Sequence, residues 1–140
     1  MRRDRQEYQR YFREIADRMQ LQNWTITIEP VPPGDAADYA EVLRTKGRRV
    51  ALIRLSELFL NSSEEDQRDT AVHELIHLQG AFVDSFIRGQ LDEEEWATYN
   101  NLREYEVDSQ AAAFAPLMPL PGEILDDIRK EQPRKHPRKR

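Results

Sequence analysis

The amino-acid sequence predicts a single α+β domain in which an N-terminal helix and a small antiparallel sheet precede two long helices. The chain has 140 residues, which is enough for one hydrophobic core but not for two. Apolar residues recur three and four positions apart in some segments and at alternate positions in others, as helices and strands require. Hydrophobic residues make up 39% and charged residues 34%, so the composition excludes wholesale disorder and a membrane protein.

Charge divides the chain into a body and a tail. Residues 129–140 contain seven Lys or Arg and a single Glu, so the rest of the chain is more acidic than the net charge of -5 indicates. Prolines and like charges oppose a helix there, and we expect a disordered basic tail after one domain at residues 1–128. Such a tail could contact nucleic acid or another acidic surface, whereas the acidic body does not favour nucleic acid.

Several classes of protein are excluded by what the sequence lacks. It has no cysteine, and therefore no disulfide, thiolate nucleophile or Cys-ligated zinc finger. No run of eighteen apolar residues is present to span a bilayer, and no apolar stretch follows the basic residues at the start. We therefore expect a cytoplasmic protein with no membrane partner.

The first half of the sequence predicts one helix and three strands. Residues 3 to about 20 have one apolar helical face, made by Tyr8, Tyr11, Phe12, Ile15, Ala16 and Met19. Residues 24–28 alternate apolar and polar side chains, as in a half-buried strand. Residues 38–44 and 49–55 are two further strand candidates, and Gly47 supplies the turn between them.

Two longer helices follow in the second half. Serines 62 and 63 precede acidic residues that can complete a helix cap, so a helix should begin near residue 63 and end near Gly80. Asp92 and the three glutamates after it repeat this pattern for a helix that Pro116 ends. A final short helix is expected over residues 123–129.

Two of the three histidines lie in the segment His73-Glu74-Leu75-Ile76-His77. On a helix, residues four apart share a face, so both imidazoles can reach one cation while Glu74 projects about 100° away. Zn²⁺ suits this arrangement because it accepts neutral imidazole nitrogens and can leave one position open for water. Packed histidines are the alternative, but burying these polar groups without partners would be costly.

A third ligand has to be a carboxylate, because the remaining histidine, His136, lies in the basic tail. Glu104 and Asp108 share one face of the second long helix with small alanines that allow close approach of another helix. We therefore favour Glu104 over Glu106 as the ligand. Asp108 can accept a proton from the far nitrogen of a ligating imidazole, for which we favour His73.

The pattern His73-Glu74-x-x-His77 followed by Glu104-x-x-x-Asp108 resembles that of gluzincin-type zinc metallopeptidases. The compact, single-domain order of elements is similar to that of the minigluzincins and phage zincin-like proteins, and residues 104–119 loosely resemble ImmA/IrrE-type regulatory peptidases. The resemblance implies a zincin-like fold in which His73, His77 and Glu104 bind zinc and Glu74 is the general base. A peptide or protein substrate would add to an exposed edge at residues 49–55, unless that strand is internal.

Oxyanion stabilisation would need a further donor, and Tyr99 and Tyr105 are candidates because a phenol could reach from the ligand helix. Other functions stay open at this stage. The zinc site could belong to a regulatory or binding protein with little general proteolytic activity, or to a protease specific for one partner. A nucleic-acid-associated protein that uses the basic tail is a further alternative.

Overall fold

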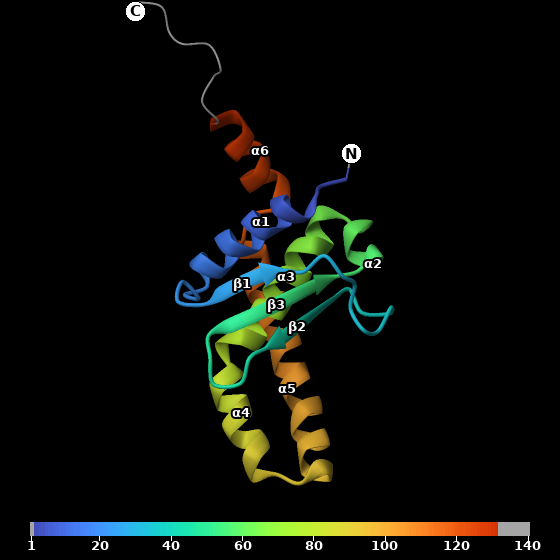
Figure 1. Ribbon diagram of the computed structural model, residues 1–140, viewed down its shortest axis with the longest axis vertical. Coiled ribbons are helices and arrows are strands. Elements are labelled where there is room, and N and C mark those ends of the chain that lie inside the picture. The colour runs from blue at the N-terminus through green and yellow to red at the C-terminus, as the bar shows by residue number, and fades with distance from the viewer. Residues whose placement is uncertain (1, 132–140) are drawn as a thin grey trace, which may run out of the picture.

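The computed structural model describes residues 2–131 and has an α+β architecture (Figure 1). In chain order its elements are α1 (Arg5–Arg18), β1 (Thr25–Ile28), β2 (Ala40–Arg44), β3 (Val50–Leu55), α2 (Glu57–Leu60), α3 (Glu64–Gln79), α4 (Ala81–Gln90), α5 (Glu93–Phe114), the 3₁₀ helix η1 (Ala115–Leu117) and α6 (Pro121–Glu131). None of the helices described has both the length and the apolar character that crossing a bilayer requires.

The C-terminal helix is longer than the sequence predicts. α6 continues to Glu131, so residues 129–131, which we expected in the basic tail, are helical. The remainder of the predicted tail, residues 132–140, lies outside the described residues and includes His136.

The sheet is mixed, so the prediction of an antiparallel sheet is wrong. β3 lies between the other two strands, antiparallel to β2 and parallel to β1. The β2–β3 hairpin turns at Gly47, whose φ of 75° favours glycine. The long connection between β1 and β2 carries the chain across the sheet before the hairpin forms, which leaves the central place for β3.

The central position of β3 also shows that residues 49–55 are not an exposed edge. The strand begins with a continuous apolar run, Val50-Ala51-Leu52-Ile53, which is typical of a strand with neighbours on both sides. The edges of the sheet are β1 and β2. Any strand that a peptide could extend therefore has to be one of these two.

The hydrophobic core lies between one face of the sheet and helices α1 and α3. Figure 1 shows α3 passing behind the strands, and α1 packs along β1. Alternate side chains of β1 and β3 are buried, which places a single sheet face against the helices. Aromatic rings of α1 meet Phe59 from α2, and the Tyr8 and Phe59 ring centres are 5.2 Å apart in an edge-to-face arrangement.

Helices α4 and α5 form a hairpin that extends beyond the sheet (Figure 1). The sequence predicts no helix over residues 81–90, where the structure has α4. Gly80 ends α3 and begins α4, and the guanidinium of Arg103 occupies the space that a Cβ at residue 80 would need. The chain therefore turns at Gly80, where φ is -96° and ψ is 6°, and α4 begins at the next residue.

Candidate metal centre

Helix α3 presents both histidines of the sequence motif on a partly exposed face. Ser63 caps the helix by accepting a hydrogen bond from the Asp66 amide. Leu75 and Ile76 are buried on the core side of the same helix. Because this face is fixed in the core, His73 and His77 lie on a neighbouring face, with 26% and 24% of their side chains exposed.

Helix α5 brings the acidic residues to the same place. Asp92 and Glu95 form the predicted capping box at its start. Val107 and Ala111 are the residues of α5 that are buried, and α5 packs along α3. Their burial fixes the rotation of α5, so that Glu104 and Asp108 face the two histidines.

The three predicted ligands converge. Glu104 Oε1 lies 2.9 Å from His77 Nε2, and Glu104 Oε2 lies 3.5 Å from His73 Nε2. One ligand atom from each of the three residues lies within 4.8 Å of the others. Two imidazole nitrogens and one carboxylate oxygen fit the donor preferences of a borderline divalent ion, so the cluster could hold a metal.

Asp108 contacts the predicted histidine, but through a different atom. Its Oδ1 lies 3.0 Å from His73 Nε2, the nitrogen that also faces Glu104. The far nitrogen, Nδ1, lies 3.4 Å from Glu74 Oε1 instead. Both carboxylates reach the same edge of the imidazole, because α5 approaches α3 from that side. The contact to the far nitrogen of a metal-bound ring stays a prediction.

The two imidazoles lie in different electrostatic environments. The Glu74 carboxylate raises the pKa of His73 above its ordinary value, with smaller contributions from Glu104 and Asp108. Burial lowers the pKa of His77 and outweighs the attraction of Glu104. Glu74 is only 14% exposed and adjoins the cluster, so it could exchange a proton with a molecule in the groove.

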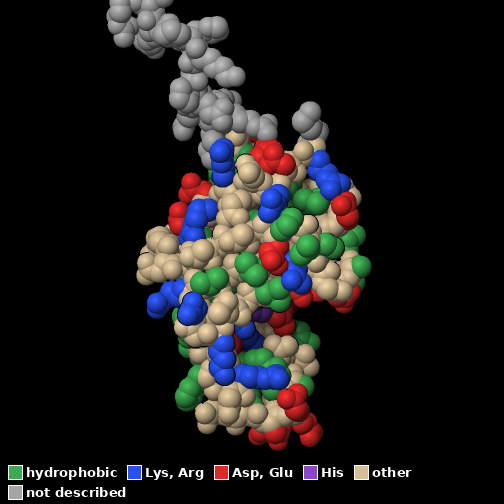
Figure 2. All heavy atoms as spheres, in the orientation of Figure 1, with side chains coloured by type: hydrophobic (Ala, Val, Ile, Leu, Met, Phe, Trp, Pro, Cys, Tyr) green, Lys and Arg blue, Asp and Glu red, His purple; other side chains and the backbone are tan. Residues whose placement is uncertain are grey.

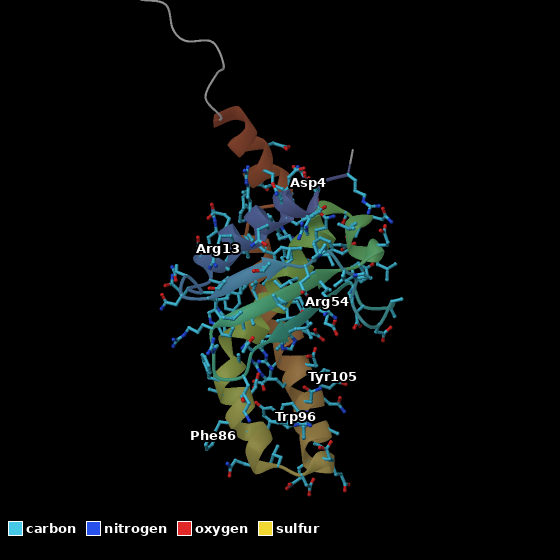
Figure 3. The ribbon with its side chains drawn as sticks, viewed as in Figure 1. Asp4, Arg13, Arg54, Phe86, Trp96 and Tyr105 are labelled. Atoms are coloured by element: carbon cyan, nitrogen blue, oxygen red, sulfur yellow. The ribbon has the colours of Figure 1, made fainter. Side chains whose placement is uncertain are left out.

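The two tyrosines proposed as oxyanion donors make no hydrogen bond to the cluster within residues 2–131. Tyr99 donates to Asp84 Oδ1 at 2.6 Å, and this hydrogen bond raises the pKa of Tyr99 to about 12. Tyr105 is 72% exposed and extends from the outer side of α5 (Figure 3). Their suggested role stays a prediction.

Asp84 is a residue that the sequence analysis missed. Its side chain lies on α4, is buried, and accepts hydrogen bonds from Tyr99 and Arg103 of α5. These two hydrogen bonds join the helices of the hairpin, and Arg103 is the residue directly before Glu104. The apolar positions 82, 83, 86 and 87 after Gly80 were the available signal for the helix that carries it.

A groove of about 440 Å³ adjoins His73 and Glu74. The other residues that line it are Asp38, Tyr39, Ala40, Asp69, Thr70, Asp108, Ala111 and Ala112. The sequence did not indicate the contribution of residues 38–40, which depends on how the edge strand β2 meets α3. Some histidine surface is visible in Figure 2, where the sheet meets the α4–α5 hairpin.

The acids that were set aside as ligands stay outside the cluster. Glu106 is exposed, and Glu93, Glu94 and Glu95 form the charged first turn of α5.

Comparison of the chain with protein-family models, with curated proteins and with solved structures finds no match. The functional assignment therefore rests on the residues and their geometry.

Proposed function

We propose that the protein is a zinc-dependent peptidase with a zincin-like fold, acting in the cytoplasm on a specific protein or peptide substrate. The convergence of His73, His77 and Glu104 beside Glu74 carries this proposal. The side chains come from two helices that are separated in sequence by the α4 segment, yet they supply the three protein ligands that a catalytic zinc site commonly uses.

The donor set favours zinc over harder cations. Mg²⁺ and Ca²⁺ prefer oxygen ligands, whereas two of the three donors here are imidazole nitrogens. A bound zinc ion supplies Lewis acidity, which polarises a peptide carbonyl and makes water more acidic. The partial exposure of all three ligand side chains leaves room for substrate to reach the site.

Glu74 is the general base in this proposal. It takes a proton from the attacking water and passes it to the leaving amine when the peptide bond breaks. Its position next to His73 and its low exposure support this role, because a shielded carboxylate interacts more strongly with a nearby proton donor.

The groove beside the cluster supports an extended peptide as substrate. It is bordered by residues 38–40, where the edge strand β2 begins, and β2 pairs only with β3 among the described strands. An extended chain could add to this free edge through backbone hydrogen bonds. Asp38, Asp69 and Asp108 in the lining favour substrates that carry Lys or Arg near the scissile bond.

The variant Glu74→Gln distinguishes two functions for this chain, peptide hydrolysis and metal binding alone. We expect the zinc-loaded variant to keep its metal and to lose at least about 100-fold in the hydrolysis of a fluorescence-quenched peptide library. Glu106→Gln, which makes the same charge change at an exposed position of α5, is the matched control and should keep full activity. Hydrolysis by Glu74→Gln at the wild-type rate would refute the proposed role of Glu74.

A further inference from the structure

A second cavity, of about 290 Å³, lies away from the metal cluster. Its walls are the β2–β3 turn, helix α4, the start of α5 and the loop that precedes β1. The residues lining it are Trp24, Arg44, Thr45, Lys46, Gly47, Arg48, Ala81, Phe82, Asp84, Ser85, Arg88 and Trp96. We call this cavity the turn pocket.

The turn pocket is rich in cations although the chain is acidic. The β2–β3 turn carries four exposed cationic side chains, Arg44, Lys46, Arg48 and Arg49, and no acid. Within the part of the chain that the structure describes, none of the four pairs with a carboxylate. Figure 2 shows Lys and Arg side chains gathered where this turn faces the α4–α5 hairpin.

The acids near the turn pocket have other partners. Asp84, the one carboxylate in its lining, is held by Tyr99 and Arg103. Arg88 lies 3.4 Å from Glu93, but 92% of that glutamate side chain is exposed, so the pair is strongly screened by water. The turn pocket therefore has an excess of positive charge over the carboxylates that residues 2–131 bring to it.

Aromatic rings lie among these cations. The guanidinium carbon of Arg49 is 5.3 Å from the centre of the Phe82 ring, and that of Arg88 is 4.6 Å from the Trp96 ring. Trp24 packs beside Phe82, with ring centres 5.8 Å apart, and Phe82 is 43% exposed. Figure 3 shows Trp96 between α4 and α5, whereas Phe86 points away from the hairpin.

We propose that the turn pocket binds single-stranded nucleic acid. Unpaired arginines and lysines attract phosphates, and exposed aromatic rings and guanidinium planes stack on bases. An acidic peptide would satisfy the cations but would offer no flat base to stack on the exposed face of Phe82. A duplex would keep its bases stacked inside, out of reach of the rings of the turn pocket.

The assignment is tested by fluorescence anisotropy with a labelled twelve-residue oligothymidylate and the full-length, zinc-loaded protein. We expect Arg48→Glu to weaken binding at least tenfold. Arg10→Glu, the same change at an exposed position of α1 outside the turn pocket, should weaken it less than twofold. Because Arg48 is exposed in a turn, circular dichroism should show the fold of the variant unchanged.

Two further readings distinguish phosphate contact from base stacking. Loss of one phosphate contact should lower the slope of log affinity against log salt by about 0.7 in Arg48→Ala. Phe82→Ala should weaken binding roughly tenfold with the salt slope unchanged, because a stacking contact releases no counterion.

Three outcomes would overturn the proposal. The first is that the wild type does not bind at about 50 mM salt, a low concentration at which phosphate contacts are favoured. The second is equal weakening by Arg48→Glu and Arg10→Glu, which would place the contact elsewhere on the chain. The third is competition by an unlabelled oligoglutamate peptide or a DNA duplex as effective as that by unlabelled oligothymidylate.

Discussion

His73 and His77 lie four residues apart on one helix, yet their surroundings favour opposite protonation states. The carboxylate of Glu74 raises the pKa of His73, while burial lowers the pKa of His77. Coordination needs both imidazoles neutral. At neutral pH His77 is therefore already in the form that binds a metal, whereas the acids around His73 favour a protonated ring whose proton a metal has to displace.

Asp108 should tune metal affinity without being one of the three ligands. Its Oδ1 lies 3.0 Å from His73 Nε2, so it restrains the ring that a metal has to contact. We expect Asp108→Asn to weaken zinc affinity roughly tenfold, because it removes a negative charge that favours a divalent cation beside His73. Competition with a chromogenic chelator measures it.

Glu106→Gln is the control for this substitution, because it removes the same charge from an exposed position two residues away. It should change zinc affinity by less than about twofold. Equal losses in the two variants would show that only the net charge of α5 matters and would refute a specific role for Asp108.

At the residue scale the sequence indicated the metal-binding cluster but not the hydrogen bonds of Asp84 that hold α5 against α4. Helical periodicity, which can be read directly from the chain, places His73 and His77 on one face of their helix and Glu104 and Asp108 on one face of another. The role of Asp84 could not be predicted, because its partners Tyr99 and Arg103 lie on another helix and are brought to it only by the hairpin.

Among the elements, the α4–α5 hairpin is held together by the hydrogen bond that Tyr99 donates to the buried Asp84. The pKa of Tyr99 is raised from 10.0 to about 12, because its neutral hydroxyl donates to Asp84. A folded-state pKa above the unfolded value means that the contribution to stability is complete below pH 10. It is lost as pH rises through 12.

Tyr99→Phe tests this pH dependence. At pH 8 the variant should be less stable than the wild type by about 1–3 kcal/mol, the usual effect of losing a hydrogen bond to a charged group. The difference in Tm should shrink steadily above pH 10. A difference that stays constant up to pH 11.5, a test point below the value of about 12, would contradict the assignment.

The variant Leu75→Ala tests how strongly the packing of α3 against the core stabilises the protein. Leu75 is fully buried, so its truncation should lower the free energy of unfolding by about 2–5 kcal/mol. Leu58→Ala, at a leucine that is 45% exposed on α2, should cost well under half of that. Urea denaturation compares the two, and equal losses would mean that α3 is not held by this side chain.

Elements with local start and stop signals were predictable. Ser63 and Asp92 cap α3 and α5 as the sequence indicates. The helix after Gly80 was missed because glycine was interpreted as the end of the helical segment, although α4 begins directly after it. The direction of β1 was predicted wrongly, because pairing between β1 and β3 depends on the path of residues 29–39 rather than on any local pattern.

At the scale of the whole molecule, the proposed metal would join α3 to α5 where the edge of the sheet meets them. An ion that binds only the folded chain stabilises it according to its concentration. Free zinc at about one hundred times its Kd should add about 2.7 kcal/mol. This raises Tm by roughly 10 °C for a domain of this size.

Differential scanning calorimetry with zinc and with a chelator measures this stabilisation. His77→Ala should show little of the zinc-dependent rise, since it removes one of the three ligands. A rise of the same size in His77→Ala would mean that zinc stabilises the chain from another place.

The metal content of the purified protein tests the central claim most directly. We expect one zinc ion per chain in the wild type and in Glu106→Ala, and little zinc in Glu104→Ala, because the Glu104 carboxylate lies 2.9 Å from His77 Nε2 whereas Glu106 is outside the cluster. A wild-type protein that binds no zinc, or equal retention by the two variants, would contradict the account.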